Sequence, residues 1–322
     1  MAVLLSVQDL SLKFSMRGGL LNRVHSEVSA VSQVNLSLKE GITVGIVGES
    51  GCGKTSLGRT LVKLYEPSSG KIYYKGQDLS TFSAKNLRLF RQEVQMIFQD
   101  PFASLNPRFS VREILEEPFR LNSTCTTEEK KEKIKFFLKI VGLDESVLEQ
   151  YPHEFSGGQR QRISIARTLI LHPKLIVADE PVSALDVSIQ SQILNLLKEL
   201  QKKLGLTYLF ISHDLSVVRY IAKEIAVMYL GKILEYGSVE DLYNNPKHPY
   251  TKALLEAIPK PDPNKRGRKN LLQGDIPSPL NPPKGCVFHT RCPLVRKICR
   301  EKSPLLVKKG NKNIHKVACH LV

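Results

Sequence analysis

Long hydrophobic runs are missing from this 322-residue chain. No apolar stretch approaches the roughly 20 residues that a membrane-spanning helix needs, which excludes a helical integral membrane protein. The first residues also lack the pattern of a signal peptide, because Asp9 and Lys13 interrupt the apolar stretch too early. We therefore expect a protein that stays in the cytosol, where cysteines are normally reduced.

Acidic residues are scarce in the last part of the chain. The whole sequence has a net charge of +16, and the residues from 260 onwards contribute +12 of it, with fifteen Lys and Arg against three Asp and Glu. A basic tail fits nucleic acid, anionic lipid, an acidic protein or simply a solvated surface, and charge alone does not choose. The rest is ordinary for a globular protein, since 42% of the residues are hydrophobic and 24% are charged.

A glycine-rich motif organises the first part of the chain. It matches the phosphate-loop pattern of Gly, four residues, Gly-Lys and then Ser or Thr. Residues 42–47 before it predict a buried strand, and residues 56–62 behind it predict the start of a helix. Glycines let successive backbone N–H groups point at phosphate, Lys54 would reach the outer phosphates, and Thr55 would ligate Mg²⁺. The predicted site comprises Gly48, Glu49, Ser50, Gly51, Cys52, Gly53, Lys54, Thr55 and Ser56.

Polar residues follow three further predicted strands. The apolar run 175–178 ends in Asp179 and Glu180, of which the first suits Mg²⁺ and the second suits orienting or deprotonating water. Gln99 follows the strand-like residues 95–98 and would touch Mg²⁺ and the attacking water. His213 follows the buried run 207–212 and would bond a terminal phosphate. Taken singly, each is also consistent with an ordinary polar residue at a strand end.

Two weaker signals complete the set. Ser156, Gly157, Gly158 and Gln159 open a predicted helix, which makes either a second phosphate-binding site or a plain N-cap. Phe14 ends a predicted strand over residues 5–14, where it would stack on a nucleotide base or belong to the core. Residues 31–38 predict a second strand, residues 15–29 a loop, and residues 111–148 a helical segment.

The order of these motifs resembles that of the ATPase subunits of ABC transporters, over about residues 1–250. The resemblance implies an α/β fold of the P-loop NTPase class: a cassette over residues 1–245, with a mixed-sheet core, an antiparallel β-subdomain and a helical subdomain at about residues 105–170. It implies that Phe14 stacks on adenine, that the loop binds ATP and Mg²⁺, and that Gln99 senses both. It also implies that Asp179 assists Mg²⁺, Glu180 polarises water and His213 contacts the γ-phosphate. Ser156, Gly157, Gly158 and Gln159 would contact ATP bound by a partner subunit.

The last part of the chain indicates which group of ABC transporters the sequence resembles. Residues 245–251, NPKHPYT, and 277–286, PSPLNPPKGC, look like the C-terminal extension of oligopeptide and dipeptide importers, which nickel importers share. We expect this extension to span residues 246–322. The resemblance implies a second ABC ATPase subunit, as a homologous heterodimer, two membrane-spanning permease subunits and, indirectly, a peptide-binding protein. It implies a peripheral location at the cytoplasmic face of the inner membrane.

Another class of function remains open from the sequence. A soluble ABC ATPase acting on nucleic acid would share the nucleotide motifs, and the basic tail is the only feature that favours it. Such proteins usually carry two cassettes in one chain, so we expect no specific nucleic acid partner. The cargo itself, whether oligopeptide, dipeptide or nickel chelate, would be chosen by other subunits.

Four cysteines gather near the end of the chain, separated by five, six and nineteen residues. In a cytosolic segment this favours a metal site over disulfides. Structural zinc sites usually show closer pairs, whereas four thiolates also suit a [4Fe–4S] cluster, which the tails of some peptide importers are thought to hold. Reduced free thiols are the remaining alternative. The residues are Cys286, Cys292, Cys299 and Cys319.

Overall fold

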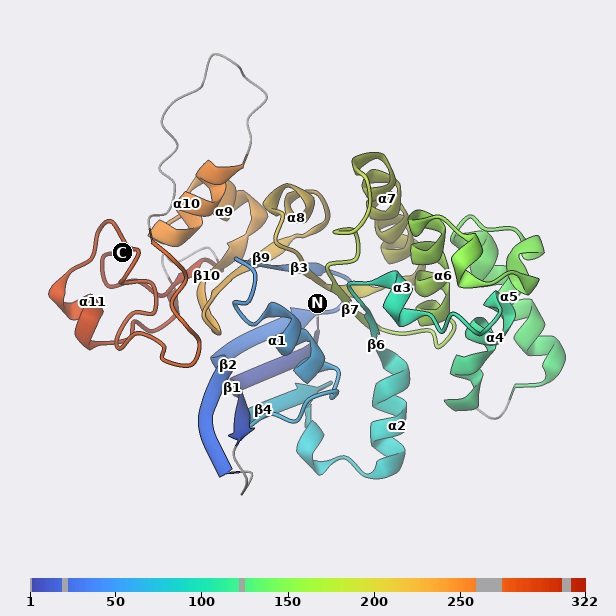
Figure 1. Cartoon of the computed structure of the whole chain (residues 1–322), viewed down its shortest axis with the longest axis horizontal. Helices are drawn as coiled ribbons and strands as arrows, with labels where there is room; N and C mark the ends of the chain where they lie inside the picture. Colours follow the sequence, from blue (N-terminus) through green and yellow to red (C-terminus); the bar gives the residue numbers. More distant parts are fainter. Residues whose placement is uncertain (1, 19–22, 122–124, 259–273, 309–313) are drawn as a thin grey trace, which may run out of the picture. The chain divides into compact units, whose positions relative to one another are not determined.

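The computed structural model describes residues 2–18, 23–121, 125–258, 274–308 and 314–322 (Figure 1). The chain folds into two compact units, each assembled from separate stretches of sequence. The first unit contains Met1–Ala2, Lys39–Ile42 and Thr81–Ile211. The second contains Val3–Leu38, Thr43–Ser80 and Ser212–Val322. Within the described residues, no helix is both long and apolar enough to cross a membrane.

The first unit is built on three parallel strands. The strand β7 (Leu175–Asp179) pairs with β6 (Val94–Ile97) on one side and with β8 (Thr207–Ile211) on the other. Every residue of β7 and β8 is buried, as their uninterrupted apolar sequences predict for strands covered on both faces. Because the strands are parallel, the residues that follow β6 and β7 emerge at the same edge.

The helices of the first unit begin at clear sequence signals. Ser110, Thr126 and Ser156 each form a capping box with the residue three positions later. The described part of the predicted helical segment over residues 111–148 is divided into two helices and two 3₁₀ turns. The next helix, α6, contacts α3, α4, α5 and α7 (Figure 1). The helices are α2 (Ala84–Glu93), α3 (Pro101–Ser104), α4 (Val111–Glu116), α5 (Thr127–Ile140), α6 (Gly157–Leu169) and α7 (Val187–Leu204).

The second unit contains a four-stranded sheet in the order β2-β1-β4-β5. Its strands are β1 (Val3–Gly18), β2 (Arg23–Lys39), β4 (Ser69–Tyr74) and β5 (Gln77–Asp78). The antiparallel strands that we predicted at residues 5–14 and 31–38 are present but longer, so the predicted loop over residues 15–29 is wrong at both ends. Polar residues there continue the strands, and Lys13 and Glu27 form an ion pair at 3.0 Å. Strands can pair through backbone hydrogen bonds without a buried apolar face. These residues therefore lack the alternation of apolar and polar side chains by which a strand is predicted from sequence.

The second unit also contains strands that pair in both directions. The strand β3 (Thr43–Val47) is parallel to β9 (Glu224–Tyr229), which is antiparallel to β10 (Lys232–Ser238). Two short strands from the tail, β12 (Lys316–Val317) and β11 (Val307–Lys308), extend this sheet beyond β10. The helices are α1 (Lys54–Leu61), α8 (Leu215–Ile221), α9 (Val239–Asn244), α10 (Pro249–Ala257) and α11 (Lys297–Glu301).

A buried carboxylate attaches the tail to this sheet. Glu235 on β10 is fully buried and accepts hydrogen bonds from the backbone N–H groups of Lys247 (2.7 Å) and His248 (3.0 Å) and from His315 Nε2 (2.6 Å). Burial also lowers the pKa of His248 to about 3, so its neutral ring can accept the N–H of Tyr250 and cap α10. One side chain thereby fixes the start of α10 and the segment before β12.

The substitution Glu235→Gln tests this attachment. We expect the free energy of unfolding to fall by about 3 kcal/mol, because the amide of Gln turns a donor toward a buried donor and the charge-assisted bonds are lost. Urea unfolding followed by circular dichroism measures the change. The exposed acid Glu256 on α10 provides the control, since Glu256→Gln should stay within about 0.5 kcal/mol of the parent protein. Equal effects of both substitutions would contradict the attachment.

Candidate functional site

The phosphate loop follows β3 in the second unit, as the sequence predicts. All five residues of β3 are buried, and α1 begins directly at Lys54 with Gly53 as its N-cap. Gly53 has a φ of 102°, and a Cβ at this position would lie 2.0 Å from the carbonyl oxygen of Ala30. Only glycine fits there, because both the backbone conformation and the space exclude a side chain. The start of α1 therefore presents backbone N–H groups at the loop, which is where phosphates bind.

The side chain of Lys54 lies within the curve of this loop. It is 5% exposed, and its ammonium donates to the carbonyl oxygens of Gly48 (2.9 Å) and Glu49 (3.0 Å). Nearby, burial raises the pKa of the Cys52 thiol, so Cys52 stays a neutral packing residue. The loop thus places a buried positive charge beside its own carbonyl groups.

Two more predicted residues belong to the second unit. The ring of Phe14, on β1, is partly exposed and meets Tyr65 edge to face, with 5.3 Å between the ring centroids. Tyr65 was not predicted, and its hydroxyl accepts a hydrogen bond from Arg59 of α1. An aromatic residue shortly after the loop helix is the signal that would have found it. His213 is exposed and lies just before Asp214, the N-cap of α8.

The first unit brings together the predicted residues that follow β6 and β7. Gln99 Nε2 donates to Glu180 Oε2 at 3.2 Å, and Asp179 is buried at the end of β7. Glu180 has a φ of 46°, in the left-handed region that non-glycine residues seldom adopt. Its carbonyl oxygen accepts the N–H and hydroxyl of Ser183, which stabilise this conformation. Strained backbone of this kind is typical of functional sites.

The predicted second phosphate-binding segment opens α6 in the first unit. The Ser156 hydroxyl accepts the N–H of Gln159, whose side-chain oxygen accepts the N–H of Ser156. Ser156 and Gln159 are exposed, whereas a Cβ on Gly158 would lie 2.5 Å from Ile189 of α7. The segment is therefore a capped helix start that packs on α7 through Gly158 and faces solvent through its polar side chains.

The four tail cysteines come close together in the second unit. Burial, and then the thiols of Cys299, Cys292 and Cys319, raise the pKa of Cys286 to about 11. The backbone N–H of Cys286 also donates to the carbonyl of Cys299 at 2.8 Å. Within the described residues, however, no group of three or more His, Cys, Asp and Glu side chains is arranged to hold a metal ion. The four thiols are neighbours without the spacing of a formed metal site.

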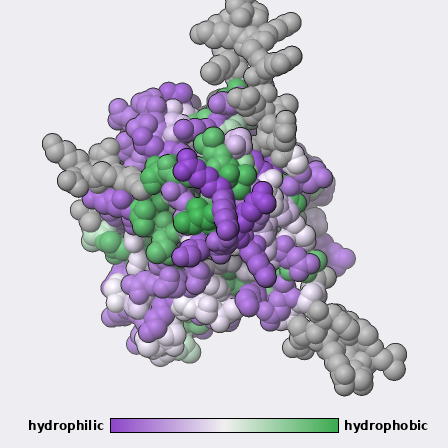
Figure 2. All heavy atoms as spheres, turned by 90° about the vertical axis from the view of Figure 1, so that its left-hand side faces the viewer, coloured by the Kyte–Doolittle hydropathy of each residue, from purple (hydrophilic) through white to green (hydrophobic). Residues whose placement is uncertain are grey.

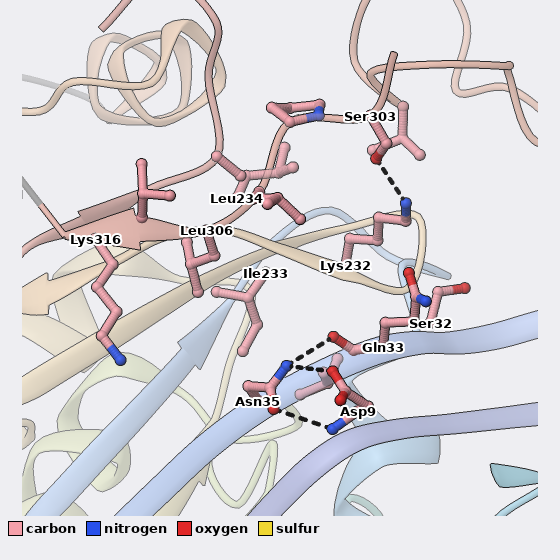
Figure 3. Close-up of a pocket in the computed structure, with 16 residues that line it drawn as sticks. Asp9, Ser32, Gln33, Asn35, Lys232, Ile233, Leu234, Ser303, Leu306 and Lys316 are labelled. Carbon is pink, nitrogen blue, oxygen red and sulfur yellow. Dashed lines mark hydrogen bonds between the residues drawn. The ribbon is translucent and has the colours of Figure 1, made fainter. Parts of the chain in front are cut away.

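A separate cavity of about 460 Å³ lies in the second unit between β2, β10 and the tail. Figure 3 shows its lining, in which Lys232 bonds Ser303 and Asn35 bonds Asp9. On the face that carries α11, apolar and hydrophilic side chains lie side by side (Figure 2). None of the predicted nucleotide-binding residues lines the cavity. The cavity is therefore separate from the residues that the sequence predicts to bind nucleotide.

Comparison with protein families gives two matches. A family model for ABC transporters matches residues 31–183. A model for the C-terminal region of oligopeptide/dipeptide transporters matches residues 234–299. The first match contains the phosphate loop, Gln99, residues 156–159, Asp179 and Glu180, and the second contains residues 246–299 of the tail.

Individual relatives match along most of the chain. The oligopeptide transport ATP-binding protein AppF of Bacillus subtilis is 54% identical, over 99% of this chain and 97% of its own. The dipeptide transport ATP-binding protein DppF of Haemophilus influenzae is 51% identical, over 87% and 86%. Among solved structures, cbiO1 from Clostridium perfringens matches with a TM-score of 0.65 and 27% identity, over 76% of this chain and 92% of its own. The ATP-binding cassette MJ0796, a dimer bound to ADP and Pi, matches with 0.64 and 28%, over 73% and 98%.

A pair of glycine substitutions tests the geometry of the loop. Gly53→Ala should lower the free energy of unfolding of the nucleotide-free protein by about 3 kcal/mol, because the methyl group would overlap Ala30 in an already unfavourable conformation. Gly51 has a φ of 75° but open space around its Cβ position. Gly51→Ala should therefore cost only about 1 kcal/mol. Urea unfolding of both variants measures the difference, and similar losses would contradict the close approach at Gly53.

Proposed function

Because the chain belongs to the ATP-binding proteins of ABC transporters, we propose that it hydrolyses ATP to power the import of oligopeptides or dipeptides. The observation that carries the ATPase function is the intact phosphate loop, with the ammonium of Lys54 inside its curve. The peptide cargo rests on the tail, which matches the C-terminal region of oligopeptide/dipeptide transporters, and on the names of the relatives. The predicted P-loop cassette fold is confirmed by the structural neighbours.

The residues of the two units take complementary roles in this proposal. The N–H groups of the loop and Lys54 bind the phosphates, and Phe14 stacks on adenine. Thr55, Gln99 and Asp179 would hold Mg²⁺ through their oxygen atoms, and the ion would supply positive charge that offsets the charge of the phosphate oxygens. Glu180 orients and deprotonates the attacking water, while His213 donates to the γ-phosphate. Glu180 suits its role because Gln99 and the strained backbone fix its carboxylate.

The capped start of α6 fits a site completed by a second subunit. Ser156 and Gln159 are exposed, and the α6 N-terminus presents N–H groups and a partial positive charge to solvent. We propose that residues 156–159 contact ATP bound by a partner ATPase, with a homologous heterodimer as the assembly. Two membrane-spanning permease subunits and a peptide-binding protein would complete the importer at the cytoplasmic face of the membrane.

The domain limits are part of the proposal, whereas the comparison with protein families bears on the nucleic acid alternative. We propose that the cassette spans residues 1–245, with the helical subdomain at about residues 105–170, and that the extension spans residues 246–322. The basic tail was the only feature in favour of a nucleic acid ATPase. Since that tail matches a transporter region over residues 234–299, we do not retain this alternative.

We propose that Cys286, Cys292, Cys299 and Cys319 bind a [4Fe–4S] cluster in the assembled protein, with zinc as the less favoured occupant. The mutual influence of the thiols supports this, because a bound metal would offset the repulsion among thiolates. The centre would stabilise the tail and takes no part in ATP hydrolysis.

Substitution of Glu180 tests the ATPase mechanism. In the transporter complex, Glu180→Gln should lower the rate of ATP hydrolysis by about 10²–10⁴, because the amide cannot accept the proton of water. Equilibrium binding of Mg·ATP should persist. The exposed Glu199 of α7 provides the control, since Glu199→Gln should leave hydrolysis unchanged. Normal turnover in Glu180→Gln would refute the assigned role.

Anaerobic purification tests the metal centre. We expect about four iron and four sulfide per chain, and a visible absorption band that disappears when Cys292 and Cys299 are replaced by Ser. Elemental analysis of the same sample measures zinc. A folded, metal-free protein in which all six cysteines of the chain titrate as thiols would show that the four tail cysteines are simply reduced.

A further inference from the structure

Glu49, the second residue of the phosphate loop, bonds through all three of its polar groups. Its N–H donates to the Tyr250 hydroxyl at 2.9 Å, and its carbonyl oxygen accepts the ammonium of Lys54 at 3.0 Å. Its carboxylate accepts two hydrogen bonds from Arg291, at 2.7 and 3.0 Å. Two of these three partners, Tyr250 and Arg291, come from the tail. The loop is therefore shaped in part by residues more than 200 positions away.

The guanidinium of Arg291 is itself firmly placed. Its side chain is only 6% exposed, and it reaches the hydroxyl of Tyr229 at 3.4 Å. The rings of Tyr229, Tyr250 and Phe288 pack against one another with centroids 4.8–5.4 Å apart. The hydrogen bonds to Glu49, before all other causes, raise the pKa of Arg291. A partly buried bidentate pair of this kind is stronger and more directional than a single contact on the surface.

The carboxylate of Glu49 poses an electrostatic problem for the loop. A loop that binds a triphosphate gains from positive potential, and an unpaired carboxylate within it would repel the ligand. Arg291 removes that repulsion and fixes the carboxylate. The hydroxyl of Tyr250 accepts a hydrogen bond from the backbone N–H of Glu49.

We propose that Arg291 is a positioning residue of the nucleotide site, which neutralises Glu49 and, together with Tyr250, holds the phosphate loop in its binding shape. The inference rests on the proposed ATPase function and adds to it a role for the tail. The C-terminal extension then affects ATP affinity through its contacts with Glu49, in addition to any contact it makes elsewhere. Arg291 acts through Glu49 and touches no reacting atom.

Equilibrium binding of Mg·ATP to the purified full chain tests the proposal. Arg291→Met should raise Kd about tenfold, because it leaves an uncompensated carboxylate in the loop. Arg291→Lys, which keeps the charge but loses the planar fork, should fall between the parent protein and Arg291→Met. In the double variant Glu49→Gln/Arg291→Met, Kd should return to within about threefold of the parent value, because the repulsive charge is gone. The exposed Arg300 of α11 supplies the matched control, and Arg300→Met should not change Kd.

Further readouts separate positioning from simple stabilisation. In the transporter complex, Arg291→Met should raise KM for ATP while kcat falls less than about threefold, whereas a loss of folded protein would lower kcat at constant KM. Thermal unfolding without nucleotide reports the folded fraction of each variant. An unchanged Kd in Arg291→Met, or no rescue in the double variant, would overturn the inference. Failure of the parent protein to bind Mg·ATP would instead overturn the proposed function.

Discussion

The hydrogen bonds from Lys54 to the carbonyl oxygens of Gly48 and Glu49 are the interaction on which the site depends. A buried ammonium is costly unless polar groups surround it. The loop meets that requirement with its own backbone, and it can do so only because glycines let the chain curve closely around the side chain. Phosphate oxygens can then replace the carbonyl groups as acceptors. The curve that stabilises Lys54 is thus also the curve that binds the ligand.

That curve is maintained from outside as well as from within. Gly53 packs against Ala30, and the N–H of Gly231, in the β9–β10 turn, donates to the carbonyl of Cys52 at 2.9 Å. Tyr250 and Arg291 bond Glu49 from the tail. These partners come from four distant parts of the sequence, all within the second unit. The shape of the loop therefore depends on contacts from distant parts of the second unit.

Sequence reasoning succeeded where function is encoded in short, ordered motifs. The strand, loop and helix around Lys54 were predicted with their context, because glycine spacing and apolar runs are local signals. The polar residues at the strand ends were identified singly, and the parallel pairing of β6 with β7 in the structure explains why Gln99 and Glu180 lie close together. The four tail cysteines were predicted to favour a metal site, with reduced free thiols as the alternative, and the structure shows them near one another.

Sequence reasoning failed where a structural feature depends on polar residues or on a contact with a residue far away in the sequence. The strands β1 and β2 extend into a polar stretch that we predicted as a loop, because pairs such as Lys13–Glu27 give no apolar alternation. The pairing of Glu49 with Arg291 spans 242 residues and has no local signature. Glu49 seemed to be an unremarkable position of the loop pattern. Its importance emerges only from the charges that surround it in the folded chain.

The carboxylates of Glu49 and Glu180 have different hydrogen-bond partners, and this contrast supports the separate roles proposed for them. The carboxylate of Glu49 accepts hydrogen bonds from two nitrogens of the Arg291 guanidinium, so its negative charge is paired with a positive one. Glu180 accepts a hydrogen bond from the neutral amide of Gln99, which orients the carboxylate without adding a positive charge. A general base must keep its basicity, whereas a carboxylate beside a triphosphate must lose its charge or be neutralised. The contacts of each residue therefore fit the role proposed for it, since Glu49 is paired with a positive charge and Glu180 is oriented by a neutral amide.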